Sequence, residues 1–223
     1  MIQLKDVSLF QGLSEPELRE IGTVLHEKEY SKGDTLLSEG NTCDRVFIVR
    51  DGRVKLYRMT AEGREQILEM LGPGDTCACN PGTREWFCSA SAEALSDCKV
   101  WFFSRDQYVR LVEKNTPLSH SLNRIFAERL RCMSSLVEEV SLKDTRKRVV
   151  KFLLDMLAHE ESKKAARAGE LPVPFTREVL AQRLGMARET VARQLHELKH
   201  EKLIDIHPHQ IVILNRLGLE KLL

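Results

Sequence analysis

The chain has 223 residues, of which 42% are hydrophobic and 30% are charged, and its formal net charge is +1 at pH 7. This length suits two domains better than one. No stretch approaches the roughly 18 consecutive apolar residues of a membrane helix, and the first residues lack the basic-then-apolar pattern of a secretion signal. We therefore expect a cytoplasmic protein with no membrane partner.

The charge is unevenly distributed along the chain. From Lys143 onward there are 16 lysines and arginines against 11 aspartates and glutamates, a net charge of +5, so the preceding part carries −4. Phosphate backbones attract basic surfaces. The C-terminal part is therefore the one expected to meet a nucleic acid.

The first part of the chain predicts a helical lead-in followed by a β domain. Within residues 1–30, Ser14 and the acids after it are typical of a helix start. From Tyr30 to about Ser104, short β runs alternate with turns such as Asp51-Gly52 and Gly72-Pro73-Gly74-Asp75. Strands repeating at this interval indicate a sandwich or barrel.

A long helix is predicted at about 118–140, after Pro117. Six side chains spaced alternately by four and three residues form a seam suited to a parallel two-helix dimer. A helix that packs only on its own domain would show a similar stripe. The predicted dimer-interface residues are Leu122, Phe126, Arg129, Met133, Leu136 and Val140. A hinge at Ser141–Asp144, a helix at 144–159 and a loop at 160–170 are expected to follow.

The stretch 176–204 predicts two helices joined by a tight turn. Val179, Leu180 and Leu184 make an apolar stripe on the first helix, and Gly185 supplies a residue that tolerates positive φ in the turn. The second helix has its own stripe at Val191, Leu195 and Leu198. Two alternating runs at 204–213, around a His-Pro-His-Gln turn, then predict the hairpin of a winged helix.

The start of the second helix carries polar side chains away from its apolar stripe. Arg188 and Arg193 suit bidentate contact with guanine in the major groove, and Glu189 can accept from cytosine N4. We therefore predict that the chain binds double-stranded DNA. The candidate DNA-binding residues are Arg188, Glu189, Arg193, Thr176 and Thr190.

The order of these parts resembles the Crp/Fnr family of bacterial transcription regulators over essentially the whole chain. The resemblance rests on Lys32-Gly33-Asp34, on Asp51-Gly52-Arg53-Val54, on Gly72-Pro73-Gly74-Asp75 and on the string from Gly185 to Arg193. It implies an α+β fold with a cyclic-nucleotide-binding-like β-roll (jelly roll) at 1–116. A dimerisation helix at 117–141 and a winged helix-turn-helix domain at 142–223 would follow.

The resemblance also implies what the protein does. It predicts a homodimeric regulator that reads a TGTGA-like palindrome through Arg188, Glu189 and Arg193 and works with RNA polymerase. One departure is Ala187, where relatives often place a Ser or Thr helix cap. An enzyme is not expected, because metal-dependent β-barrel enzymes need histidine ligands and residues 30–104 contain none.

The effector segment departs from the pattern of cyclic-nucleotide-binding relatives. Those proteins have a Gly-Glu pair and then an Arg before Ser-Ala or Thr-Ala, whereas here Cys88 precedes Ser89-Ala90 and the Gly-Glu pair is missing. A cyclic phosphate buried without that Arg would carry uncompensated charge. The sequence therefore argues against cyclic AMP as the effector.

Four cysteines fall within 22 residues of this segment, at Cys77, Cys79, Cys88 and Cys98. Thiolates ligate iron–sulfur clusters, haem iron and other soft metals, and they also support redox switching. The alternatives are a thiol switch, a bound cluster, haem or other metal, and cysteines that only fill space beside a cyclic nucleotide or small organic effector. The sequence leaves these alternatives open.

Overall fold

The computed structural model describes residues 2–61, 63–77, 86–141, 144–162, 170–172, 176–207 and 210–223. These residues group into two compact units, one formed by 1–58 with 68–133 and the other by 59–67 with 134–223. Each unit is treated by itself below.

The first unit begins with short helices η1 (Leu4–Asp6) and η2 (Ser8–Phe10), followed by α1 (Glu15–Val24). The predicted helix start is confirmed: the backbone N–H of Ser14 donates to the Glu17 carboxylate at 2.7 Å, and a capping box forms. The lead-in ends earlier than predicted, because residues 26–30 form strand β1 (His26–Tyr30). This strand has no apolar alternation that the sequence could reveal, and it is defined by its antiparallel pairing with β7.

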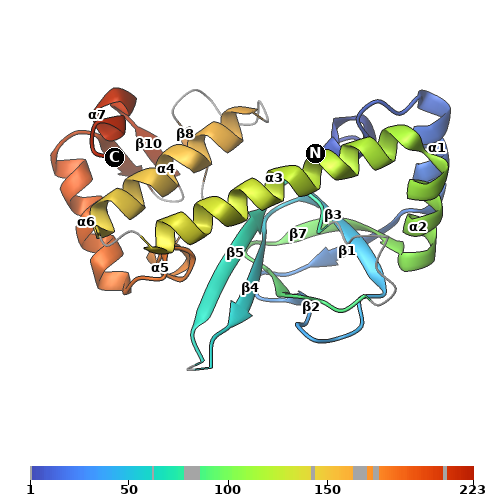
Figure 1. The fold of residues 1–223 in the computed structure, drawn as a ribbon, viewed down its shortest axis with the longest axis horizontal. Helices are drawn as coiled ribbons and strands as arrows, with labels where there is room; N and C mark the ends of the chain where they lie inside the picture. Colours follow the sequence, from blue (N-terminus) through green and yellow to red (C-terminus); the bar gives the residue numbers. More distant parts are fainter. Residues whose placement is uncertain are drawn as a thin grey trace. The chain divides into compact units, whose positions relative to one another are not determined.

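Two sheets form the β domain of this unit, which confirms the predicted β-roll (Figure 1). One sheet has the strand order β1-β7-β3 and the other has the order β2-β6-β4-β5. Their apolar faces enclose a core that includes Leu9, Ile48, Val49 and Phe103, each at most 1% exposed. The remaining strands are β2 (Thr35–Leu37), β3 (Arg45–Asp51), β4 (Val54–Met59), β5 (Glu65–Leu71), β6 (Ser91–Ala94) and β7 (Cys98–Ser104).

The turn after β3 requires glycine. Gly52 has φ +83°, and a Cβ added there would lie 2.4 Å from the carbonyl oxygen of Asp97 and 2.6 Å from Cβ of Cys98. A side chain would be strained by the backbone conformation and would also overlap these neighbours.

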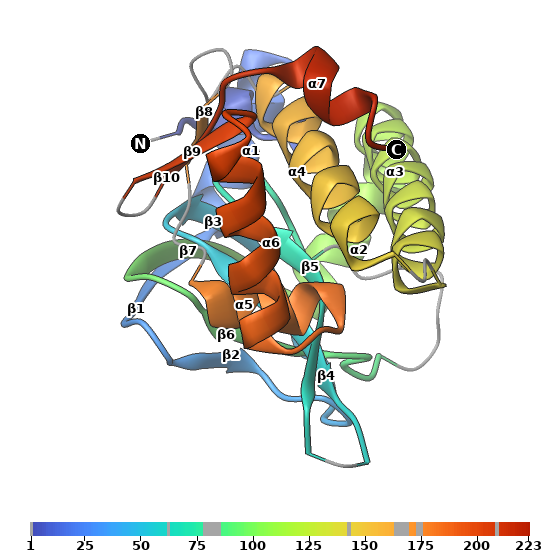
Figure 2. The same ribbon diagram turned by 90° about the vertical axis from the view of Figure 1, so that its left-hand side faces the viewer.

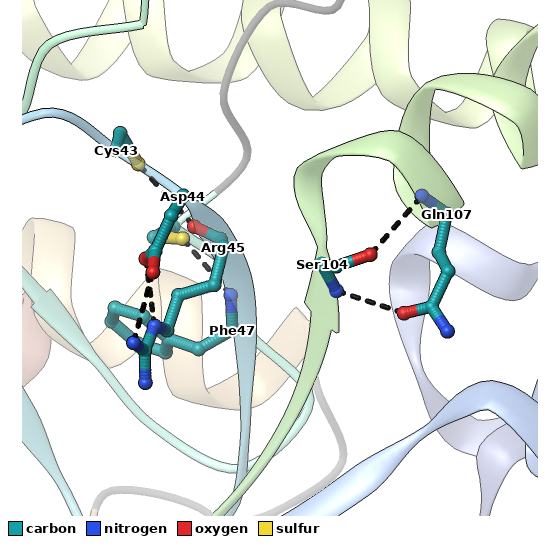
Figure 3. A network of polar contacts seen from close by, with 7 residues as sticks. Cys43, Asp44, Arg45, Phe47, Ser104 and Gln107 are labelled. Carbon is teal, nitrogen blue, oxygen red and sulfur yellow. Dashed lines mark hydrogen bonds and ion pairs between the residues drawn. The ribbon is translucent and has the colours of Figure 1, made fainter.

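Two helices complete the first unit. Helix α2 (Arg105–Lys114) was not predicted, although Ser104 and Gln107 form the capping box that marks its start (Figure 3). Helix α3 (Thr116–Ser141) confirms the predicted long helix and contributes to both units. Its first turns pack on the β domain, because Leu118 and Leu122 belong to the core.

The second unit contains the predicted helix pair and wing (Figure 2). A three-stranded sheet of order β8-β10-β9 confirms the hairpin at 204–213 and adds a strand that was not predicted. The predicted loop at 160–170 is wrong at both ends, since α4 continues to Ser162 and β8 begins at Glu170. The β8 strand has only three residues, too few for a period, and is defined by pairing with β10. The elements are α4 (Thr145–Ser162), β8 (Glu170–Pro172), α5 (Arg177–Leu184), α6 (Arg188–His200), β9 (Ile204–His207), β10 (Gln210–Ile213) and α7 (Arg216–Glu220).

Parts of several predicted features lie outside the described residues. These are residues 142 and 143 of the predicted hinge, residues 163–169 of the predicted loop, residues 208 and 209 at the tip of the wing, and the side chain of Val140 in the predicted seam. Within the described ranges, no helix combines the length and the apolar character needed to cross a bilayer.

Candidate DNA-binding surface and sensor site

The helix-turn-helix is held by the two apolar stripes seen in the sequence. Val179, Leu180 and Leu184 of α5 are 1–8% exposed, and Val191, Leu195 and Leu198 of α6 are 0–4% exposed. Gly185 ends α5 in the left-handed conformation, with φ 61° and ψ 39°, as predicted. This packing fixes which face of α6 is left for a ligand.

The start of α6 presents its charged side chains to solvent. Arg188, Glu189 and Arg193 are all exposed, and Thr190 is half-buried. Arg193 lies 3.9 Å from Glu197, a loose contact, while Arg188 and Glu189 have no ion-pair partner among the described residues. These groups are therefore free to bind an external partner of complementary charge and hydrogen-bonding pattern.

Both helix starts suit phosphate contact. Thr176 caps α5, with its hydroxyl oxygen accepting from the backbone N–H of Val179 at 3.2 Å, so the hydroxyl hydrogen remains able to donate. Ala187 begins α6 without any side-chain cap. Uncapped N–H groups at a helix N-terminus attract anions.

The wing is fixed by charge contacts with α6. Lys199 lies 2.8 Å from Asp205 of β9, and His207 lies 3.3 Å from the same carboxylate. The hydrogen bond from Lys199 is the largest cause that lowers the pKa of Asp205.

The apolar face of α3 that is left exposed differs from the predicted seam. Leu130, Met133 and Val137 are 70%, 40% and 67% exposed and follow a four-three-four spacing from Phe126. Leu122 and Leu136 are already buried within the chain, at 3% and 8% exposure. Of the predicted positions whose side chains are described, Met133 belongs to this exposed stripe.

Arg129, also predicted for the seam, is engaged inside the β domain. Its Nη1 donates to the carbonyl oxygen of Cys77 at 2.8 Å, a second nitrogen donates to the carbonyl of Thr76, and Nε lies 3.3 Å from the Glu69 carboxylate. The side chain therefore connects α3 to β5 and to the segment that follows it. The sequence did not reveal this connection, because the contacts are long-range and two of them are to main-chain oxygens.

Cys77 is placed beside β3. Its thiol accepts from the backbone N–H of Phe47 at 3.2 Å, and its own N–H donates to the carbonyl of Phe47 at 3.0 Å. Cys79, another candidate from the sequence, lies outside the described residues.

Cys88 has a neighbour that the sequence did not single out. Its thiol is in hydrogen-bond contact with the thiol of Cys43. Burial, followed by the charge and hydrogen bond of Cys43, raises the pKa of Cys88 to about 12. Cys43 Sγ also donates to the carbonyl of Arg45 at 3.3 Å (Figure 3).

Cys98 lies apart from Cys77. It packs against Gly52, whereas Cys77 bonds to Phe47, and five residues at about 3.3 Å each separate these positions by roughly 15 Å. Burial is the largest cause that raises the pKa of Cys98 to about 11, with contributions from three carboxylates. These belong to Asp34, Asp97 and Asp51, which line a cavity of about 300 Å³ with Cys98.

The described cysteines therefore do not converge on one centre. Across the part of the chain that the structure describes, no three His, Cys, Asp or Glu side chains are arranged to hold a metal ion. The cysteines that the structure describes do not form a shared thiolate site for a cluster, haem or another metal.

Two family models match the chain. The cyclic nucleotide-binding domain matches residues 27–115, and the Crp-like helix-turn-helix domain matches residues 147–222. Together they cover the β-roll and the helix pair with its wing.

Relatives and solved structures extend the match to nearly the full chain. The "CRP-like cAMP-activated global transcriptional regulator" of Mycobacterium tuberculosis is 28% identical over 94% of this chain and 93% of its own. The nitrogen fixation regulation protein FixK of Bradyrhizobium diazoefficiens is 26% identical over 92% of this chain and 85% of its own. The structure of FixK2 from Bradyrhizobium japonicum is 28% identical, with a TM-score of 0.79 over 89% of this chain and 97% of that one. These relatives are transcription regulators, not enzymes.

Proposed function

The chain belongs to the Crp/Fnr family of DNA-binding transcription regulators, and from this premise we propose that it reads a TGTGA-like palindrome as a homodimer. Arg188, Glu189 and Arg193 are the proposed base-contacting residues, and Thr176 and Thr190 are proposed to contact the adjacent backbone. The observation that carries this proposal is that Arg188 and Glu189, at the start of the packed helix α6, are exposed and have no ion-pair partner among the described residues. An arginine pairs with guanine and a glutamate with cytosine N4, which matches a G·C-containing half-site.

The exposed stripe of α3 supports the two-fold arrangement. Leu130, Met133 and Val137 are the proposed contacts between the two copies, because a stripe of this spacing pairs with an identical helix. Phe126 continues the same spacing toward the β domain. A dimer places two recognition helices one DNA turn apart, at about 34 Å, as a palindrome requires.

The proposed signal is not a cyclic nucleotide. Cys88 stands where cyclic-nucleotide-binding relatives have the phosphate-pairing Arg, and its buried thiol faces Cys43 rather than an open anion site. A buried cyclic phosphate would have no cation at this position. We place the sensing chemistry at the cysteines of the β-roll, and the separation of Cys77 from Cys98 favours thiol chemistry over a shared metal.

RNA polymerase is the proposed partner on DNA. The support is that relatives covering more than nine-tenths of the chain are named as regulators, one of them a cAMP-activated global transcriptional regulator. Reconstituted transcription from a promoter carrying the selected site would reveal the direction of control.

Selection from a pool of random duplexes tests the reading of DNA. The reduced full-length protein is expected to enrich two inverted TGTGA-like half-sites with a fixed spacing. Enrichment of single half-sites would contradict the dimer, and no enriched sequence would contradict base reading altogether.

A further inference from the structure

Cys43 and Cys88 are brought together by a short antiparallel bridge within the β-roll. Thr42 pairs with Phe87, and the backbone N–H of each cysteine donates across the bridge, at 2.7 Å from Cys43 and 2.9 Å from Cys88. Each cysteine is the residue after a member of the bridge. The two side chains therefore lie on the same face, diagonally across from each other.

Their thiols are in contact and shielded from water. Cys43 is 1% exposed and Cys88 is 7% exposed, and a hydrogen bond links the two side chains. The 44 residues between them in the sequence make this a tertiary contact, which no spacing rule could identify. A pair of thiols in contact has the arrangement from which a disulfide forms.

We propose that Cys43 and Cys88 are a redox couple that a peroxide converts to a reversible disulfide, and that this bond is the signal for the β-roll. The inference deepens the proposed function and rests on it for the effect on DNA binding. The proposed signal then involves one pair of cysteines and not a centre built from four. One member of the pair, Cys43, lies outside the cysteine-rich segment.

The chemistry balances with a peroxide as the oxidant. One thiol of the pair loses its proton and attacks one oxygen of hydrogen peroxide, which forms a sulfenic acid, and the released hydroxide takes up that proton to become water. The sulfur of the other cysteine then attacks the sulfenic sulfur, and the leaving hydroxide takes the proton of this second thiol to become a second water. Two thiols lose two electrons in total, and one peroxide is reduced to two waters.

The contact between the two thiols makes their ionisation coupled. An ionised Cys43 raises the pKa of Cys88, in addition to the larger effect of burial. Ionisation of both thiols together is therefore disfavoured, so one sulfur attacks the peroxide and the other completes the bond as a thiol.

Closing the bond changes the backbone. Diagonal neighbours across an antiparallel pair have Cα atoms about 7–8 Å apart, whereas disulfides usually span about 4.4–6.8 Å. The two segments must therefore approach by roughly 1 Å. This approach would draw the residues before β3 toward those before β6, and so convert oxidation into a movement within the sensor.

Peptide mapping of the full-length protein tests the bond directly. The reduced protein is treated with hydrogen peroxide, remaining thiols are alkylated, and tryptic peptides are compared before and after dithiothreitol. The expected product is the peptide 33–45 joined to the peptide 85–99, with two thiols lost per chain and restored by the reductant. Separate sulfinic acids, or a bond that uses Cys77 or Cys79, would overturn the proposal.

Three variants make the assignment specific. Cys88 and Cys98 share the peptide 85–99, so C98S must retain the linked product and C88S must lose it. C132S, which removes the exposed cysteine of α3, must also retain the product. Retention of the link in C88S would overturn the assignment to this pair.

DNA affinity supplies the second readout, measured on the selected duplex for reduced and oxidised protein. A change of about fivefold or more, within the usual range of allosteric coupling, is expected for the wild type and for C132S but not for C43S. An equal affinity for both forms would overturn the role as a signal. If the reduced protein binds no palindrome selectively, the proposed function is wrong. Peptide mapping would still show whether Cys43 and Cys88 form a disulfide.

Discussion

The recognition helix and the β-roll hold their polar side chains in opposite ways. At the start of α6, Arg188 and Glu189 are exposed and have no ion-pair partner in the described part of the chain. In contact with the β-roll, Arg129 is bound to Glu69 and two carbonyls, while Cys43 donates to the carbonyl of Arg45 and its thiol contacts that of Cys88. The exposed α6 side chains are available to a ligand, whereas the proposed response of the β-roll would exchange contacts that its side chains already make.

Separation of the two copies in the proposed homodimer should have the strongest effect on DNA binding. A double substitution of Leu130→Glu and Val137→Glu places like charges in the proposed dimer stripe, which should yield monomers in sedimentation. The affinity for the palindrome should fall by about 10³-fold or more, the minimum usual gap between specific and nonspecific DNA. The exposed Arg19→Ala of α1 is the control, and an unchanged dimer in the double variant would contradict the stripe.

The close packing of the β-roll can be tested at Gly52. Gly52→Ala should lower the free energy of unfolding by about 2–5 kcal/mol, because backbone strain adds to overlap with Asp97 and Cys98. Gly33→Ala has a similar φ of +92° but no atom within 4 Å, so it should cost only about 1–2 kcal/mol. Equal losses in chemical denaturation would mean that the close packing at Gly52 is not significant.

At the DNA end, Arg188→Ala should weaken binding to the palindrome by about 1–3 kcal/mol for each half-site and relax the preference for guanine. The fold should be unaffected, since the side chain is exposed and unpaired. Competition between the palindrome and single-base variants of the duplex measures the preference for guanine. A uniform loss on every sequence, with the preference intact, would instead assign Arg188 to the phosphate backbone.

A smaller effect is expected from supplying the missing helix cap. Ala187→Ser should stabilise α6 by about 1 kcal/mol without changing which bases are read, and Thr176→Ala should cost a similar amount at α5. Thermal unfolding of each variant and of the wild type measures these changes in stability. A loss of stability in Ala187→Ser would show that the α6 start does not accept a hydroxyl cap.

The buried thiols should affect stability at high pH. The pKa values of Cys98 and Cys88 are raised to about 11 and about 12, so the folded protein keeps protons that the unfolded chain releases above about pH 9. Their stabilising contribution is therefore present below pH 9 and is lost as pH rises through the folded values. Unfolding measured from pH 8 to pH 11 should show this fall, with a shallower slope in C98S.

How much could be predicted from the sequence differs between the two ends. The α5 and α6 stripes, the Gly185 turn and the wing pairing follow local periods, and the structure confirms them. Strand β1 was missed because its charged residues have no apolar alternation, and β8 was missed because it is too short. A capping box at Ser104 and Gln107 could have identified α2.

The sensor contacts could not be predicted from local patterns. Arg129 fits the heptad spacing, yet its partners lie about 50 residues earlier in the chain and include main-chain oxygens. Cys43 was not among the candidate cysteines, because nothing in the local sequence links it to Cys88. Long-range pairing of strands creates both contacts, and only the tertiary fold reveals it.

A dimer that reads bases as well as phosphates must distinguish two duplexes of equal charge. Fluorescence anisotropy of the reduced protein on the palindrome and on a scrambled duplex of equal composition, at two salt concentrations, measures this difference. We expect a preference of about 10³-fold or more for the palindrome, with affinity for both duplexes falling steeply as salt rises. Equal affinity for the two duplexes at each salt concentration would contradict it.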